Sequence, residues 1–270
     1  MPDIWTHLIH GSKVGKESGL LFDEDNKRKI FNLGNIFINI FFYSDDEEFR
    51  EFGKIVHTRK CGSFLNYLSY EVFKTQPEFI YGMVCHHWLD RLTYPYIFDR
   101  TVNLNRKNFE EKIDEKMVDM YFNKDISEMN LKNFIPEIIP DFLLDKIIES
   151  LNNIYSFKDL DITSLYENML NNYYLQENKN QKKDLLKGFR KVFFTGNDEE
   201  KKEDNFYDVL NLKNQRWNHP IMGWTYKKTF LDIYDESISA AINTISESIK
   251  KNNQPIIHNI AYFTNLACTN

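Results

Sequence analysis

Apolar residues recur at helical spacing along most of this 270-residue chain. Residues three and four apart lie on one face of a helix, so the pattern predicts helices that each bury one side. The stretch Lys29–Phe42 is apolar on nearly all sides, which predicts a helix inside the core. Further amphipathic helices are predicted at 62–74, 77–94, 109–122, 142–154, 162–175 and 226–251.

Prolines and glycines mark the expected ends of these helices. Pro2 and Asp3 suit a first turn, because proline has no amide hydrogen to lose and an acidic side chain favours the positive end of the helix dipole. Gly11 is expected to end that first helix. The helix that begins at Pro77 is expected to stop at Tyr94, because the proline that follows disfavours helix in the residue before it.

The composition also favours helices. The chain has only 10 glycines and 7 prolines, and it shows no block of alternating strand-like residues. Two polar stretches, Gln176–Lys183 and the charge run Asn197–Asn205, are expected to be exposed connectors. We therefore predict an all-α fold with one domain over residues 1–270.

Charge and targeting signals narrow the possible partners and location. The net charge of −6 gives no basic footprint for non-specific nucleic-acid binding, so a nucleic-acid partner is not expected. The longest apolar run, Ile36–Tyr43, is far too short to cross a bilayer, and the first residues lack the pattern of a secretory signal. Cys61, Cys85 and Cys268 lie far apart in sequence and are expected to be small buried side chains in a reducing compartment. These features predict a cytoplasmic location.

The most informative polar residues are His86 and Asp90. They are four residues apart in a helical context, so they lie on the same face of a helix. An imidazole and a carboxylate placed this way can hold one metal ion. The spacing alone is weak support, because such a pair is more often a hydrogen bond or a solvated salt bridge.

The surroundings of this pair resemble a known family. The segment Tyr81–Ile97, YGMVCHHWLDRLTYPYI, resembles the motif H-x-x-x-D-x-x-x-H-P-Y of the zinc-dependent phospholipase C family. Further stretches resemble that family in the same order along the chain. They are Met1–Gly11 (MPDIWTHLIHG), Leu33–Tyr43 (LGNIFINIFFY), Gly53–Leu65 (GKIVHTRKCGSFL) and Arg106–Asp114 (RKNFEEKID). The likeness covers about the first 115 residues, and beyond them only a helical pattern remains.

The resemblance implies a helical fold that holds up to three zinc ions in a cleft between helices. By motif position, it implies metal ligands at His7, His57, His86, Asp90 and Glu110. His7 and Asp90 would belong to one centre, with the N-terminal amine as a possible further ligand. His57, His86 and Asp90 would hold another ion, together with position 39.

Three expected ligand positions differ from the family pattern, namely Asn39, Tyr94 and Arg106. Arginine stays protonated in proteins and cannot bind a metal, so the centre that would use Tyr94, Arg106 and Glu110 is expected to be empty. The Arg106 guanidinium is expected to take the place of that ion and pair with Glu110. Asn39 offers a neutral amide oxygen where the family has an aspartate, and an amide cannot act as a general base. We therefore expect zero to two zinc ions rather than three.

The resemblance and the three changed positions together suggest two functions. The first is a phospholipase C-like hydrolase that acts on a phospholipid or another phosphoester, with Asn39, Asp90 and Arg106 at the reacting centre. The second is a catalytically inactive relative that serves as a metal-binding or structural protein. A single-strand zinc nuclease is a third, weaker alternative, which the acidic balance does not support. His10, His87, His219 and His258 match no motif position and are interpreted as structural.

Overall fold

The computed structural model describes residues 3–20, 22, 24–157, 160–171, 208–262 and 264–268. Helices dominate these ranges, and the expected all-α fold is confirmed apart from one short hairpin. The elements are α1 (Ile4–Glu17), α2 (Asp25–Ile36), η1 (Phe37–Tyr43), α3 (Glu47–Thr58), α4 (Cys61–Val72), α5 (Pro77–Arg100), α6 (Arg106–Phe122), η2 (Ile126–Glu128), η3 (Leu131–Asn133), α7 (Asp141–Tyr155), β1 (Trp217–Asn218), β2 (Thr225–Tyr226) and α10 (Phe230–Lys251). Residues 162–171 are also helical.

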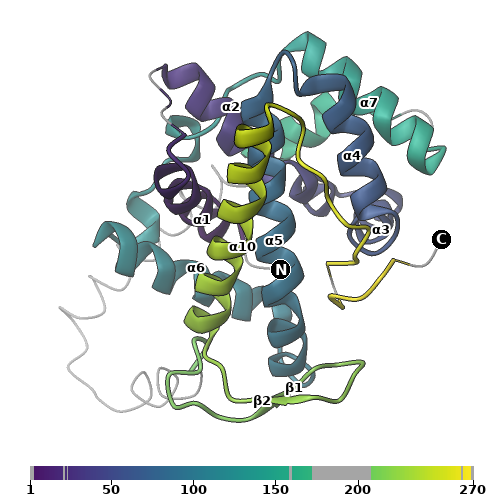
Figure 1. Cartoon of the computed structure of the whole chain (residues 1–270). Helices are drawn as coiled ribbons and strands as arrows, with labels where there is room; N and C mark the ends of the chain where they lie inside the picture. Colours follow the sequence, from purple (N-terminus) through teal and green to yellow (C-terminus); the bar gives the residue numbers. More distant parts are fainter. Residues whose placement is uncertain are drawn as a thin grey trace, which may run out of the picture.

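Helix α5 is the centre of the molecule, with α2 and α10 packed along it and α1 and α4 also in contact (Figure 1). The axes of α2 and α5 approach closely where Gly34 meets Gly82. A Cβ atom at Gly34 would lie 2.2 Å from the carbonyl oxygen of Phe79, and one at Gly82 would lie 2.1 Å from that of Phe31. Only glycine fits at this crossing, and the crossing decides which part of α2 faces α5.

The start of α1 is held from outside the helix as well as by its own cap. Asp3 is the N-cap and accepts a hydrogen bond from the amide of Ile4. Asp114, on α6, accepts hydrogen bonds from the amides of Trp5 and Thr6 at 2.8 and 3.0 Å. These amides lie in the first turn and have no partner within the helix, so a buried carboxylate from α6 satisfies them. The first turn of α1 is thereby fixed beside α6.

Two expected helix ends are wrong. Helix α1 continues through Gly11 to Glu17. Gly11 does not end the helix but lets it approach the Asn35 side chain of α2, since a Cβ at Gly11 would lie 2.4 Å from Nδ2 of Asn35. Helix α5 continues through Pro95 to Arg100. Proline removes one backbone hydrogen bond, but the turn after it carries the fully buried side chain of Tyr96, so packing outweighs the local preference.

The apolar stretch expected as one helix at 29–42 is divided in two. Helix α2 ends at Ile36, and the chain continues as the 3-10 helix η1. The expected helix at 226–251 begins later, because Thr229 caps α10 in a box with Asp232. The stretches Gln176–Lys183 and Asn197–Asn205 lie outside the described residues.

The end of the chain returns to the first half of the molecule. The side-chain oxygen of Asn259 accepts a hydrogen bond from the amide of Gly62, and the amide of Tyr262 donates to the carbonyl of His57 at 2.9 Å. Cys61 and Cys268 meet there, with their sulfur atoms 3.6 Å apart. Buried apolar side chains from both halves join one core. No helix of the described ranges is long and apolar enough to cross a bilayer.

Candidate metal centre

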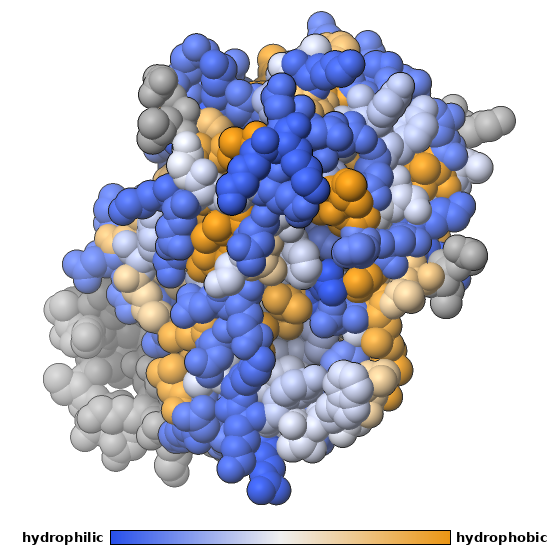
Figure 2. Space-filling model, in the orientation of Figure 1, coloured by the Kyte–Doolittle hydropathy of each residue, from blue (hydrophilic) through white to orange (hydrophobic). Residues whose placement is uncertain are grey.

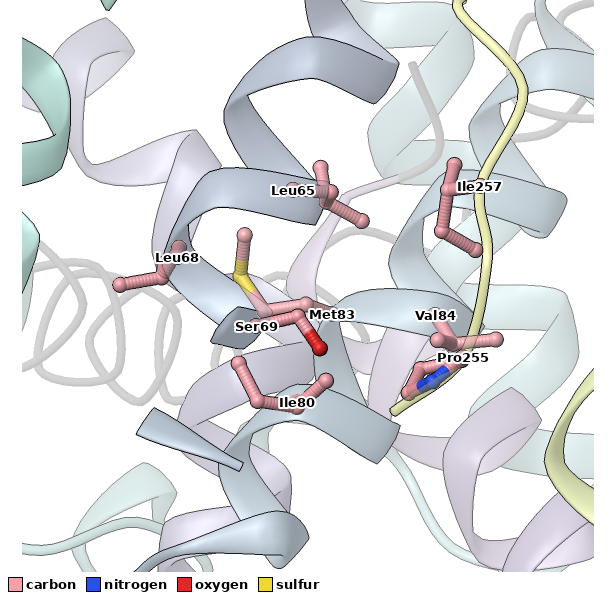
Figure 3. Close-up of a pocket in the computed structure, with 8 residues that line it drawn as sticks. All are labelled: Leu65, Leu68, Ser69, Ile80, Met83, Val84, Pro255 and Ile257. Atoms are coloured by element: carbon pink, nitrogen blue, oxygen red, sulfur yellow. The ribbon is translucent and has the colours of Figure 1, made fainter. Parts of the chain in front are cut away.

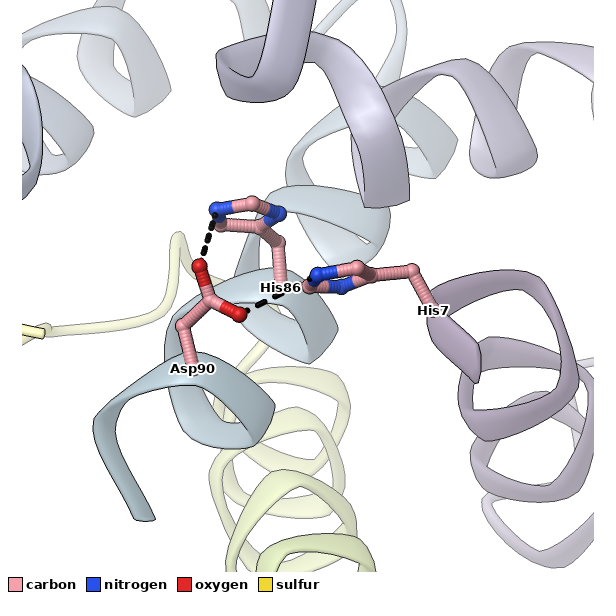
Figure 4. A group of neighbouring side chains, drawn as sticks. All are labelled: His7, His86 and Asp90. Atoms are coloured by element: carbon pink, nitrogen blue, oxygen red, sulfur yellow. Dashed lines mark ion pairs between the residues drawn. The ribbon is translucent and has the colours of Figure 1, made fainter. Parts of the chain in front are cut away.

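Four polar side chains meet in the middle of the fold. His7 comes from α1, His57 from α3, and His86 and Asp90 from α5. The Nε2 atoms of His7 and His86 lie 3.1 and 3.2 Å from the two carboxylate oxygens of Asp90, and Nε2 of His57 lies 3.8 Å from the nearer one. All four side chains are 0% exposed. Figure 4 shows the imidazole of His86 facing one carboxylate oxygen of Asp90 and that of His7 facing the other, and the two rings are stacked with centroids 4.5 Å apart.

Backbone carbonyls fix the orientation of two of the imidazoles. Nδ1 of His57 lies 2.6 Å from the carbonyl oxygen of Gly53, and Nδ1 of His86 lies 2.9 Å from that of Asn35. A carbonyl can only accept, so Nδ1 carries the proton in both rings. In a neutral imidazole, Nε2 then has a lone pair, which here points toward Asp90. The contact between His86 and the Asn35 carbonyl depends on the crossing of α2 and α5 at Gly34 and Gly82, because Asn35 directly follows Gly34.

Burial lowers the pKa of two histidines of the cluster. Desolvation lowers the pKa of His57 to about 3 and also lowers the pKa of His7, although the charge of Asp90 opposes this shift. Burial raises the pKa of Asp90, but the nearby imidazoles of His86 and His7 outweigh burial, so its pKa stays well below the usual value. The cluster therefore contains a buried carboxylate beside two imidazoles, those of His7 and His57, whose pKa values burial lowers.

The unsatisfied atoms of this cluster fit a metal ion. Both carboxylate oxygens of Asp90, both ring nitrogens of His7 and Nε2 of His86 are buried and make no hydrogen bond of good geometry. Such atoms cost about 1–3 kcal/mol each when they lack a partner. One ligand atom from each of these three residues lies within 4.8 Å of the others, so the cluster can hold a metal ion. An imidazole–carboxylate donor set is typical of protein metal centres.

Asn39, the position expected beside His57, His86 and Asp90, lies in η1. Its side chain is buried, and its Oδ1 atom makes no hydrogen bond. A buried amide oxygen is available for a ligand, but it carries no charge.

The positions expected to form the emptied centre also lie near one another. Nη1 of Arg106 donates a hydrogen bond of 2.5 Å to the hydroxyl of Tyr94, and its guanidinium lies over that ring. Burial raises the pKa of Glu110, which the charge of Arg106 partly offsets. Arg106 thus donates hydrogen bonds to the hydroxyls of Tyr94 and Thr101, and its charge also acts on Glu110, the partner that the sequence led us to expect.

Sequence reasoning missed Tyr262 altogether. Its ring centroid lies 5.5 Å from that of His57 and 5.6 Å from that of His86, so it covers one side of the cluster. No motif marks this tyrosine, and only the return of the chain end brings it there. His10 was interpreted as structural, and it contacts Ser237 at 3.0 Å rather than the cluster.

Two pockets lie elsewhere. One is an apolar hollow between α4, α5 and the chain end (Figure 3). It is lined by Leu65, Leu68, Ser69, Ile80, Met83, Val84, Pro255 and Ile257. The other, of about 210 Å³, lies between α1, α6 and α10. Neither is lined by a residue of the His–Asp cluster.

Comparisons with protein-family models, characterised proteins and solved structures give no match to this chain.

Proposed function

We propose that this protein is a metal-dependent phosphoester hydrolase of the zinc-dependent phospholipase C type, with one retained metal centre. The observation that carries the proposal is the buried Asp90 carboxylate faced by the ring nitrogens of His7 and His86. Zinc suits two imidazoles and one carboxylate, and this set of three ligands leaves a position for water or substrate. The motif resemblance of the first 115 residues supports the choice of reaction.

The residues of this chain would divide the work as follows. His7, His86 and Asp90 would hold the ion, with His57 beside the carboxylate, and the ion would supply Lewis acidity toward a phosphoryl oxygen and make an attacking water more acidic. Arg106 would supply a positive charge for a phosphate group near Tyr94. Asn39 cannot take a proton from the water, and loss of a general base costs about 10²–10⁴ in rate. Hydrolysis is therefore expected to be slow.

A specific observation favours the second candidate, a metal-binding protein without catalysis. The four side chains of the cluster, His7, His57, His86 and Asp90, are 0% exposed, and Tyr262 packs against two of them. A substrate would have to displace covering side chains to reach the ion. A closed centre is typical of structural metal sites.

One experiment separates these functions. The protein is purified without chelator, its metal content is measured by elemental analysis, and its hydrolysis of a chromogenic phosphocholine ester is followed. The matched variants are Asp90→Asn, which removes the central charge, and His258→Ala, which changes an exposed histidine elsewhere.

Zinc together with hydrolysis, both lost in Asp90→Asn and kept in His258→Ala, supports the hydrolase. Zinc without hydrolysis supports the metal-binding protein. Absence of zinc from the purified protein, and of any zinc uptake after its addition, contradicts both.

A further inference from the structure

The tip of the β1–β2 hairpin is a preformed loop with apolar side chains on its outside. The side chain of His219 accepts hydrogen bonds from the amides of Ile221 and Met222, at 3.3 and 3.2 Å. Its backbone bonds to Trp224 and Gly223 close the loop. These bonds satisfy the polar backbone of the loop from within, while Ile221, Met222 and Trp224 are 60, 41 and 58% exposed. A loop built this way presents apolar side chains without needing to refold.

The base of the hairpin is anchored to the fold. Trp217 is buried, donates from Nε1 to the carbonyl of Lys228 at 3.0 Å, and stacks on Tyr226 with ring centroids 4.7 Å apart. It also packs edge-on against Tyr96 of α5, at 5.5 Å. The hairpin therefore lies at the end of α5 that carries Arg100, and Figure 1 shows it at one extremity of the molecule.

The charge of this segment differs from that of the whole chain. Residues 209–228 contain four cations, Lys213, Arg216, Lys227 and Lys228, and no carboxylate, although the chain has a net charge of −6. The first three of these cations are exposed. In Figure 2 the end with the hairpin shows pale and orange side chains beside strongly hydrophilic ones.

Exposed apolar side chains next to a cationic segment suit one kind of partner. A bilayer surface with anionic lipids takes up aliphatic side chains below its headgroups, holds tryptophan at the interface and attracts nearby cations. A protein partner would instead need a broad surface of about 800 Å² on each side, which a loop tip does not supply.

We propose that the β1–β2 hairpin tip docks this protein on an anionic phospholipid bilayer, with Ile221, Met222 and Trp224 entering the interface. The link to catalysis rests on the proposed function, because a phospholipase C-like enzyme must meet its substrate at such a surface. The docking itself needs neither the metal nor hydrolysis. It places the end of α5 that carries Arg100 at the bilayer, and Tyr94 lies within two helical turns of that end.

The test is co-sedimentation of the full-length protein with vesicles. One set contains phosphatidylcholine alone, and the other contains equal parts of phosphatidylcholine and phosphatidylglycerol. The tip variant is Ile221→Ser/Met222→Ser/Trp224→Ser. The charge variant is Lys213→Gln/Arg216→Gln/Lys227→Gln. The matched control is Ile138→Ser/Ile256→Ser, which removes two apolar side chains that are each 75% exposed and lie outside the hairpin.

We expect the protein to bind the anionic vesicles. The tip variant should bind them at least about tenfold more weakly, because burying one large apolar side chain changes the affinity by about that factor or more. Each lost cation is expected to cost about fivefold on anionic vesicles only. Circular dichroism checks that each variant is folded, and a folded single Trp224→Ser variant replaces any triple variant that is not.

Three results of the vesicle assay would overturn the inference. They are no binding of the unaltered protein to anionic vesicles, equal binding by a folded tip variant, and an equal loss in the control. If the tip variant instead abolishes self-association in sedimentation velocity runs without vesicles, the tip is a protein contact and the inference is wrong. Each measurement is repeated on metal-free protein. Vesicle binding without zinc uptake would leave the docking intact while the proposed function fails.

Discussion

Removal of metal by a chelator is expected to lower the melting temperature of this protein by about 5–11 °C. The His7–His86–Asp90 cluster buries ligand atoms that have no hydrogen-bond partner, so the folded state should bind the ion and the unfolded chain should not. At a free zinc concentration of about one hundred times the dissociation constant, binding stabilises the folded state by about 2.7 kcal/mol. For a chain of this size, each kcal/mol shifts the melting temperature by about 2–4 °C.

The assay is thermal unfolding followed by circular dichroism, with zinc titrated into protein that has first been stripped by a chelator. The melting temperature should rise with the logarithm of zinc concentration once the site is saturated. Asp90→Asn should abolish this rise, because the amide carries no charge and leaves the imidazoles as the only strong donors. His258→Ala should keep it. A melting temperature that does not depend on zinc, or the same dependence in Asp90→Asn, would refute the reasoning.

Three further predictions concern other parts of the chain. Gly82→Ala should destabilise the protein by about 2 kcal/mol or more in urea unfolding, because its Cβ would lie 2.1 Å from a carbonyl oxygen of α2. The control is Gly15→Ala, where a Cβ makes ordinary contacts. Equal stabilities of the two variants would contradict the tight crossing of α2 and α5. Asn39→Asp should tighten zinc binding, measured by calorimetry, and raise the rate of ester hydrolysis, because the aspartate restores a negative charge and a proton acceptor. A slower or unchanged rate would show that Asn39 does not limit the reaction. The hydrogen bond between Cys268 and Cys61 lowers the pKa of the Cys268 thiol to about 7. The reaction of Cys268 with a thiol reagent should therefore rise with pH and reach half its maximum near pH 7. Half-maximal reaction near pH 9 would contradict this shift.

Several local features could be predicted from the residues alone. Helical spacing predicted α4, α6 and α7 to within a few residues, and it placed His86 and Asp90 on one face of α5. Pro77 marked the start of α5 correctly. These features depend on neighbours within about one turn, and such neighbours are read directly from the order of residues.

The grouping of His7 and His57 with this pair came from a motif resemblance and not from any local pattern. The contacts that hold the rings, such as the Asn35 carbonyl at His86, leave no mark in the sequence because a backbone carbonyl belongs to every residue. Tyr262 was missed for a similar reason, since its place beside His57 depends on a long return of the chain.

Pro95 shows why the local preferences failed where they did. A proline disfavours helix by removing one hydrogen bond, and the sequence records that cost but not the packing of Tyr96 that exceeds it. The sequence alone determined which segments are helical and which residues share a helix face. Tertiary structure decided which faces meet, where helices end under packing, and that a buried carboxylate is surrounded by imidazoles. These outcomes depend on contacts between distant segments, whose energies exceed the local preferences of the chain.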